Sequence, residues 1–313
     1  MSVDACPACG STRLSDYPMS RRSGRRNFRC RDCGLAGWRD RDALPPVTVI
    51  GLDEIGVEER AAWFALKREG VVDSAWQEIL DSLEERLGGA SGHRVYDVGA
   101  GDGHFLAVAR ERGFDVGGNE VLAAAIEIAR NDNDIDLDLG DLSDLGLADA
   151  ADALTLWCVL AHVPDPHRLL QACHDTLRPG GVMYLQTPYR CAVDTTALAA
   201  LRGTGGRFSR WVDRRIAQHH WILHTRRSMR AELERAGFID VEVRPRARYS
   251  LRAAPYLHSL GLPESAAGRV GGAVDTLLDR GFAPRIVLDV FARKPYGPGA
   301  PRTVTPASEE VRQ

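Results

Sequence analysis

One segment constrains this chain of 313 residues more than any other: an apolar strand, a glycine turn and a helix in direct succession. The strand pattern Val95–Val98 is followed by the turn Gly99–Gly103, and an apolar helical pattern begins at Phe105. Glycine lets the backbone turn sharply and lets a ligand approach it closely, while the N-terminus of the next helix presents N–H groups without helical partners. The segment therefore predicts a ligand-binding turn.

The alternation of strand and helix continues beyond this turn. Apolar runs and helical patterns follow each other at 114–120, 122–130, 153–157, 167–177 and 182–186. A helical pattern at 228–236 precedes the last two strand candidates, at 238–243 and 286–292. This order is typical of βαβ units. We therefore expect an α/β fold with a mostly parallel, Rossmann-like sheet in three layers.

The glycine spacing argues against a dinucleotide site. A dinucleotide-binding loop has its third glycine at position 104, where this chain has His104, and Gly103 comes one residue too early. Asp97, inside the end of the strand, suits a cationic ligand instead. A sulfonium that also carries an ammonium group is one such ligand.

From about residue 93 to 190 the chain resembles the class I S-adenosylmethionine-dependent methyltransferases, whose first motif matches D-V-G-A-G-D-G at 97–103. The run 114–120 resembles their second strand, whose final acidic residue binds both ribose hydroxyls, and L-G-D-L at 139–142 resembles the end of the third, which binds adenine. The resemblance implies a seven-stranded sheet with an antiparallel last strand. It also implies that S-adenosylmethionine is held by Asp97, Gly99, Ala100, Gly101, Gly103, Glu120, Asp141 and Leu142.

The loop after the expected fourth strand supplies two further candidates, Trp157 and His162. The run 153–166 resembles the family's fourth strand and its loop, and the turn at 177–182 resembles the entry to the fifth. Ligands bind at this carboxyl edge of open α/β sheets. We therefore expect Trp157 to lie at the cofactor, and we interpret His162 either as a packing or capping residue or as a catalytic base.

A second group of histidines lies at 218–225, a stretch that resembles the mobile border of the family's acceptor pocket. Methyl transfer needs an aligned nucleophile and exclusion of water, and a His base helps where the acceptor is a hydroxyl or an acidic carbon. We rank His220 above His219 and His162 as this base, because a helical segment would place His220 and His224 on one face. Metal binding by this stretch and a solvated loop stay open as alternatives.

Four of the seven cysteines form two C-x-x-C-G pairs near the N-terminus: Cys6, Cys9, Cys30 and Cys33. The two-residue spacing lets both thiolates of a pair reach one tetrahedral ion, and the following glycine lets the backbone turn toward the sulfurs. A redox dithiol is the competing interpretation, but neither pair opens a helix in a βαβ unit. The four cysteines therefore predict a structural zinc ion in a zinc ribbon.

Composition divides the chain into four parts. Residues 1–44 form the Arg- and Cys-rich zinc-ribbon module, which the pair Pro45-Pro46 closes. Two helical patterns fill 45–90, the methyltransferase-like domain covers 91–294 with an acceptor-side insertion at 191–228, and a tail poor in large apolar residues covers 295–313. Such a tail cannot offset its ordering entropy by burial, so we expect it to be disordered.

Charge and hydropathy bear on the partners of the chain. The formal net charge is −3, no apolar run approaches the roughly 20 residues of a membrane span, and no signal-peptide pattern is present, so we expect a cytoplasmic protein without membrane contact. A zinc ribbon ahead of such a core resembles bacterial sugar C-methyltransferases and related natural-product enzymes, which implies a small-molecule acceptor. Nucleic acid is not an expected partner. The alternatives are an RNA methyltransferase guided by the arginines of the ribbon and a cofactor-binding module without catalysis.

Overall fold

The computed structural model describes residues 3–17, 26–39, 68–192, 220–248, 250–259, 262–282 and 284–297, together with 58, 61, 64–65, 194–196 and 203–204. The module boundary expected near Pro45 and most of the expected tail lie outside these residues. Among the helices within the described ranges, none combines the length and the apolar character that crossing a bilayer requires.

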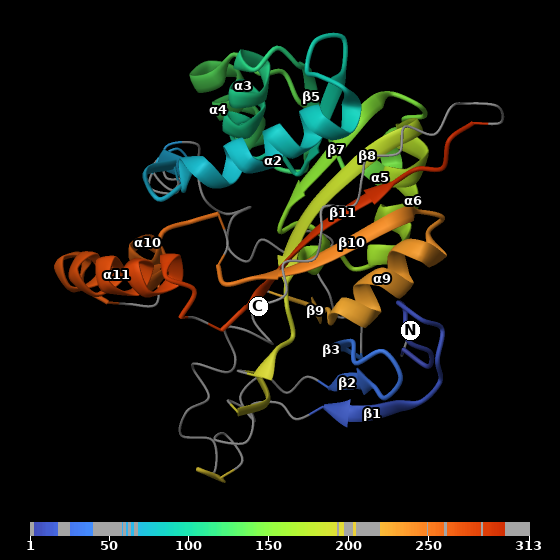
Figure 1. The fold of residues 1–313 in the computed structure, drawn as a ribbon, viewed down its shortest axis with the longest axis vertical. Coiled ribbons are helices and arrows are strands. Elements are labelled where there is room, and N and C mark those ends of the chain that lie inside the picture. The colour runs from blue at the N-terminus through green and yellow to red at the C-terminus, as the bar shows by residue number, and fades with distance from the viewer. Residues whose placement is uncertain are drawn as a thin grey trace.

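The centre of the molecule is a seven-stranded sheet in the order β10-β11-β8-β7-β4-β5-β6 (Figure 1). Its strands are β4 (Arg94–Val98), β5 (Asp115–Glu120), β6 (Asp138–Leu139), β7 (Ala151–Trp157), β8 (Leu177–Pro188), β10 (Ile239–Arg246) and β11 (Val287–Arg293). The neighbouring pairs β8–β7, β7–β4, β4–β5 and β5–β6 are all parallel. β11 runs antiparallel between β8 and β10. The expected α/β class, the Rossmann-like sheet and the antiparallel last strand are confirmed.

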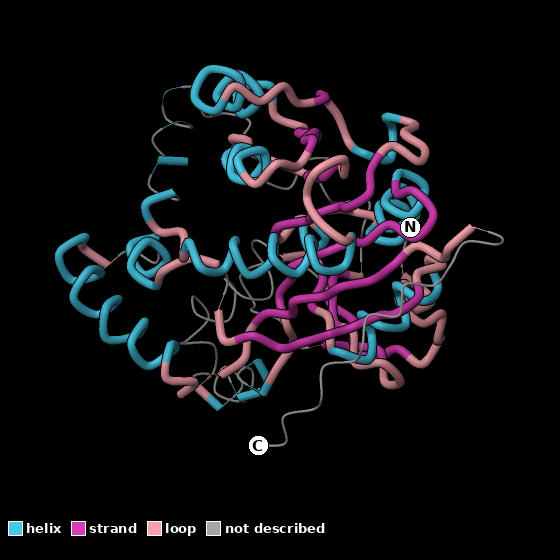
Figure 2. The backbone as a smooth tube through the Cα atoms, turned by 45° about the horizontal axis from the view of Figure 1, so that its top comes forward, coloured by secondary structure: helices cyan, strands magenta, loops and turns pink. Residues whose placement is uncertain are grey.

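Helices cover both faces of this sheet (Figures 1 and 2). One face carries α2 (Asp73–Leu87), α3 (His104–Glu111) and α4 (Ala123–Asn133). The other carries α5 (Leu142–Leu145), α6 (Pro166–Thr176) and α9 (Arg226–Arg235). Successive strand residues point to opposite faces, so Ala153 packs toward α2 and α3 whereas Leu154 packs toward α6 and α9.

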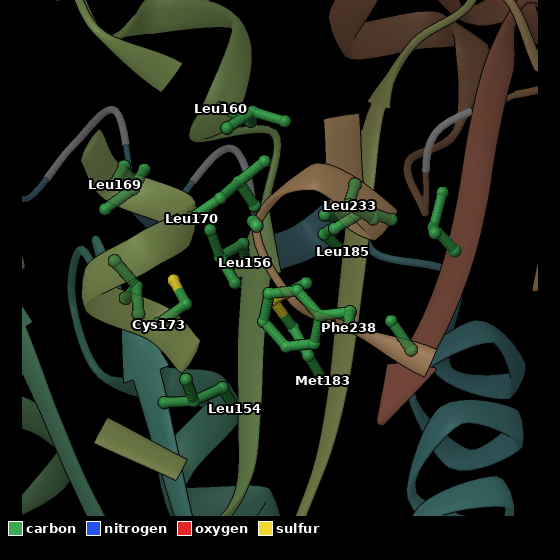
Figure 3. Close-up of a cluster of buried hydrophobic side chains, with 14 of the residues drawn as sticks. Leu154, Leu156, Leu160, Leu169, Leu170, Cys173, Met183, Leu185, Leu233 and Phe238 are labelled. Atoms are coloured by element: carbon green, nitrogen blue, oxygen red, sulfur yellow. The ribbon is translucent and has the colours of Figure 1, made fainter. Parts of the chain in front are cut away.

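The larger apolar cluster fills the space between the sheet and α6 and α9 (Figure 3). Leu169, Leu170 and Cys173 recur at helical spacing on α6, and all three are buried. The Asp165 side chain caps α6 by accepting from the Arg168 N–H. This packing fixes α6 and, with it, the loop that leaves the end of β7.

The sequence pattern does not predict two helices that lie between β10 and β11, α10 (Ala253–Ser259) and α11 (Glu264–Asp279). They pack closely at Gly271, where a Cβ atom would lie 2.7 Å from the Ala254 Cβ. Arg248, just after β10, makes ion pairs with Asp275 and Asp279 of α11. α11 is thereby held beside the end of β10.

A second sheet joins the N-terminal ribbon to the main domain, in the order β1-β2-β3-β9. The ribbon supplies β1 (Leu14–Tyr17), β2 (Asn27–Cys30) and β3 (Ala36–Trp38), and the segment before α9 supplies β9 (Ile222–Leu223). β3 and β9 pair antiparallel, and a Cβ atom at Gly37 would lie 2.8 Å from the Trp221 carbonyl oxygen. The ribbon is therefore continuous with the main domain through β9.

Candidate functional site

The glycine turn lies between β4 and α3, with Gly99, Gly101 and Gly103 in the left-handed region at φ of 67°, 60° and 69°. Side chains at these positions would also meet neighbours. A Cβ atom would lie 2.8 Å from Val159 at Gly99, 3.1 Å from Phe64 at Gly101 and 3.1 Å from Ile135 at Gly103. The turn is thus a cradle of bare backbone that suits the close approach of a ligand.

Asp97 and Ala100 tie this turn to both neighbouring strands. The Asp97 side chain is buried at the end of β4, and its Oδ1 accepts from Thr155 Oγ1 of β7 at 2.6 Å. The Ala100 N–H donates to the Asn119 carbonyl oxygen of β5 at 3.0 Å. The two bonds hold the turn at the carboxyl edge of the sheet, with a carboxyl group beside it.

Glu120 ends β5 with its carboxylate at the glycine turn. Its Oε2 accepts from the Gly101 N–H at 2.9 Å. Its Oε1 accepts from the N–H groups of Val121 and Leu122 at 2.7 and 3.2 Å. Because a carboxylate has about four acceptor positions, about one of them is left for a ligand hydroxyl at this buried residue.

Asp141 and Leu142 begin α5 at the end of the next strand, β6. Asp141 Oδ1 accepts from the Ser143 N–H at 2.8 Å, and Leu142 is buried in the first helical turn, where backbone donors lack helical partners. Asn119 was not among the predicted site residues, yet its Nδ2 donates to the Gly140 carbonyl at 2.8 Å. Within the described residues its buried Oδ1 has no partner. Its signal in the sequence is its position next to Glu120 at the end of β5.

Phe64 and Arg68 close the glycine turn from outside, and neither was among the predicted site residues. Phe64 is buried, and it packs with Ala125 and Ile128 of α4. Arg68 makes an ion pair with Asp102 of the turn at 3.6 Å. A helical pattern predicts that this stretch is a helix, but it does not indicate which side chains reach the turn.

Trp157 ends β7 in a group of aromatic side chains. Its ring centroid lies 5.1 Å from that of Phe105, 5.0 Å from that of Tyr184 and 6.1 Å from that of Trp76. Considering the described residues alone, its buried Nε1 has no hydrogen-bond partner. A buried donor of this kind at a strand end is a natural partner for a ligand acceptor.

Cys158, His162 and His220 meet at the carboxyl end of β7. Cys158 Sγ lies 3.9 Å from His162 Nε2 and 3.8 Å from His220 Nε2, and all three side chains are half-buried. Cys158 has a φ of 64°, a left-handed value that is uncommon away from glycine. The structure thus brings together two predicted histidines and adds a cysteine that was not predicted. No spacing in the sequence links these positions.

The segment around His220 is not helical, although a helix was the reason for ranking His220 above the other histidines. Residues Ile222–Leu223 form β9, because β3 supplies partners for their backbone groups. His220 and His224 have different surroundings, since His220 lies half-buried beside Cys158. His224 is fully buried, and its Nε2 lies 2.5 Å from Glu232 Oε2 of α9. The expectation of a helix here is wrong, whereas the choice of His220 itself stays a prediction, and His219 lies outside the described residues.

A cavity of about 360 Å³ opens beside the same strand ends. It is lined by the start of α2, Tyr184 and Gln186 of β8, the segment after β10 and the end of α11. Gln186 pairs with Trp157 in the register of the sheet, and its carbonyl oxygen accepts from the Cys158 N–H at 2.9 Å. The cavity is therefore next to the strand end that carries Cys158.

A polar network forms one wall of this cavity, with Gln186 and Asp289 buried and Arg246 exposed. Gln186 Nε2 donates to Asp289 Oδ1 at 2.9 Å, and Arg246 Nε pairs with Asp289 Oδ2 at 2.8 Å. Burial raises the pKa of the Asp289 carboxyl, although Gln186 and Arg246 oppose the shift. Burial and the Asp289 charge raise the pKa of the Tyr184 hydroxyl. These groups suit a ligand that carries hydrogen-bonding groups of its own.

The four ribbon cysteines converge, with their Sγ atoms all within 4.8 Å of one another. Cys6 and Cys33 are 3.5 Å apart, and Cys9 and Cys30 are 3.6 Å apart. Four sulfurs at about 2.3 Å from one tetrahedral zinc ion would be about 3.8 Å apart, so this donor set fits the ion. The glycine after each pair adopts a positive φ, as the predicted turns require.

Sequence comparison places most of this architecture in one family. Residues 70–243 match the family described as "Methyltransferase domain". The ubiquinone biosynthesis O-methyltransferase of Alkalilimnicola ehrlichii is 33% identical over 115 residues, which cover 34% of this chain and 47% of that protein. The same enzyme of Acinetobacter baumannii is 32% identical over 116 residues, which cover 34% and 49%. The chain thus spans about half the length of the curated relatives it matches.

Two solved methyltransferase structures are similar to this chain at low sequence identity. Phosphoethanolamine N-methyltransferase 2 of Haemonchus contortus, in complex with S-adenosyl-L-methionine, has a TM-score of 0.47 and 18% identity over 70% of this chain and 52% of that chain. An S-adenosylmethionine-dependent methyltransferase from Mesorhizobium loti has a TM-score of 0.44 and 23% identity over 66% and 92%.

Proposed function

Because this chain belongs to the methyltransferase domain family, it is an S-adenosylmethionine-dependent methyltransferase, and we propose that it methylates a small molecule at the carboxyl ends of β7 and β8. The cavity of about 360 Å³ beside these strand ends carries the proposal. Pockets for small molecules span about 300–1,000 Å³. The relatives named O-methyltransferases, and the polar wall at Gln186 and Asp289, support a hydroxyl as the acceptor group.

S-adenosylmethionine supplies an activated methyl group when it is bound. We propose that Glu120 uses its remaining acceptor position for a ribose hydroxyl, and that Asp141 and the Leu142 N–H bind adenine. The amino-acid end would lie along Asp97, Gly99, Ala100, Gly101 and Gly103, with Trp157 beside the reacting carbon. The bare backbone of the turn and the acidic ends of two successive strands support this assignment.

We also propose that the cluster at the end of β7 removes the proton of the acceptor hydroxyl. His220 is the first choice and His162 the second, since both are half-buried within hydrogen-bonding reach of one strand end. His220 accepts the proton directly if the cluster holds no metal ion. It acts as a ligand if the ion inferred below is present.

For the ribbon, we propose a structural zinc ion held by Cys6, Cys9, Cys30 and Cys33. The four thiols complete a tetrahedral set, and three of them are buried, as in closed structural sites. The ion would fix the turns that precede β1 and β3, and β3 in turn pairs with β9.

The acceptor class is tested by transfer of a labelled methyl group from S-adenosylmethionine to a cell extract separated by size. We expect label in the low-molecular-weight fraction and none in purified RNA. Label that accumulates mainly in RNA would replace our proposal by an RNA methyltransferase. Tight cofactor binding without label in any fraction would indicate a module without catalysis.

Glu120→Ala should weaken S-adenosylmethionine binding by about 2 kcal/mol, or roughly 30-fold, because the ribose hydroxyls lose a charged acceptor. Calorimetric titration measures the effect, and circular dichroism checks that the variant is folded. Glu120→Gln keeps an oxygen acceptor and should lose less. Glu127→Ala, an exposed glutamate on the neighbouring helix α4, is the matched control and should bind as the wild type does. Wild-type affinity in a folded Glu120→Ala variant would contradict the ribose assignment.

A further inference from the structure

We propose that Cys158, His162 and His220 form a second metal site, which binds a zinc ion at the acceptor end of the methyltransferase domain. The site differs from the ribbon in its ligands and in its place in the fold. Binding of the ion follows from the geometry of the cluster alone, and only its role in the reaction rests on the proposed function.

The ligand atoms are spaced for one ion. The Cys158 sulfur and the two imidazole nitrogens lie within 4.8 Å of one another, with sulfur to nitrogen distances of 3.8 and 3.9 Å. Zinc binds sulfur at about 2.3 Å and nitrogen at about 2.0–2.1 Å, so a tetrahedral ion would place them about 3.6 Å apart. Shifts of a few tenths of an ångström, within reach of side-chain rotation, would complete the site.

Each ligand comes from a segment that the fold holds in place. The Cys158 N–H is bonded to the Gln186 carbonyl oxygen at 2.9 Å. His162 closes the short helix η2 (Leu160–His162), and the carbonyl of its neighbour Ala161 accepts from the Trp221 N–H at 2.9 Å. This last bond fixes the residue after His220, just before β9. The backbone therefore positions all three ligands without an ion: Cys158 directly after β7, His162 at the end of η2 and His220 just before β9.

The donor set indicates the metal and its kind of site. One thiolate and two imidazoles suit zinc, and binding would release the Cys158 thiol proton to solvent. Among the residues that the structure describes, the group has three members, and three protein ligands with an open fourth position are typical of catalytic zinc. All three side chains are half-buried, so a small ligand can reach the open position.

The open position gives the ion a role at the acceptor. An acceptor hydroxyl bound there would have a lowered pKa and would lose its proton to water. Its oxygen lone pair would form the bond to the methyl carbon, while the carbon–sulfur bond of the sulfonium would break with its electron pair staying on sulfur, leaving S-adenosylhomocysteine. Cys158, His162 and His220 would hold the ion without changing protonation during transfer.

Zinc counting by elemental analysis of the purified full-length chain tests the inference without any acceptor. Protein expressed with added zinc and freed of loosely bound metal should carry two ions per chain. Cys158→Ser and His162→Ala should each carry one. Cys191→Ser changes a half-buried cysteine outside both clusters and should keep two.

Cobalt substitution of the wild type and of Cys158→Ser gives a second readout. The cobalt–thiolate absorption should be weaker in Cys158→Ser by the contribution of one thiolate. S-adenosylmethionine binding measured on each variant checks that the main domain is folded. One ion in the wild type, with the same count in Cys158→Ser and in His162→Ala, would overturn the second site. Methyl transfer could still occur in that case with His220 as the base, so failure of this inference is distinct from failure of the proposed function.

Discussion

Replacing Cys30 by serine should remove the zinc ion of the ribbon and unfold its described residues, 3–17 and 26–39, because zinc binding contributes about 10–16 kcal/mol to the folding of comparable modules. The consequence should reach beyond the ribbon. β3 is the partner of β9, and the Trp38 N–H donates to the Trp221 carbonyl at 3.0 Å, one residue from His220. We therefore expect kcat to fall while S-adenosylmethionine affinity persists, since β4, β5 and β6 make no pairing with the ribbon.

Elemental analysis and calorimetric titration of the same preparation measure the two parts of this prediction. Cys191→Ser is the matched control, with zinc, affinity and kcat retained. A wild-type protein that holds no zinc in the ribbon, when prepared without chelators, would count against the four-cysteine site. Loss of cofactor affinity together with zinc would instead mean that the main domain cannot fold without the ribbon.

Replacing His220 by alanine should lower kcat by about 10²-fold or more, the usual scale for loss of acid–base assistance. The expectation follows from position. His220 Nε2 lies 3.8 Å from Cys158 Sγ at the end of β7, whereas the proposed ribose and adenine contacts lie at the ends of β5 and β6. Cofactor affinity should therefore remain unchanged.

Steady-state kinetics with the identified acceptor measure this effect, and cofactor titration gives the second readout. His167→Ala, on α6 and outside the cluster, is the matched control and should keep wild-type kcat. A His220→Ala variant with most of its kcat would exclude both the base and the ligand role at this residue.

The sequence alone determined the parts of the protein that depend on neighbouring residues. The glycine turn and the strands and helices expected at 95–98, 105–112, 114–120, 122–130, 153–157, 167–177 and 182–186 were predicted from periodicity and turn chemistry, which act over a few positions. The antiparallel last strand was predicted from the family resemblance. The two C-x-x-C-G pairs could likewise be predicted as metal ligands from the sequence, since each pair brings its own two sulfurs close together. Glu120 and Asp141 were predicted as cofactor ligands from the family resemblance, and the structure places them at the carboxyl ends of the successive parallel strands β5 and β6.

Only the tertiary structure decided how distant segments meet. A helical pattern was expected around His220, but Ile222–Leu223 forms a strand because it pairs with the edge of β3. His224 lies in a buried ion pair with Glu232 of α9. Cys158 joins the two histidines because a left-handed φ turns the chain at the end of β7, which no local pattern signals. The cavity beside Gln186 likewise forms between α2, α11 and three strands. Such contacts depend on the packing of the whole chain, which overrides the local preferences of the residues involved.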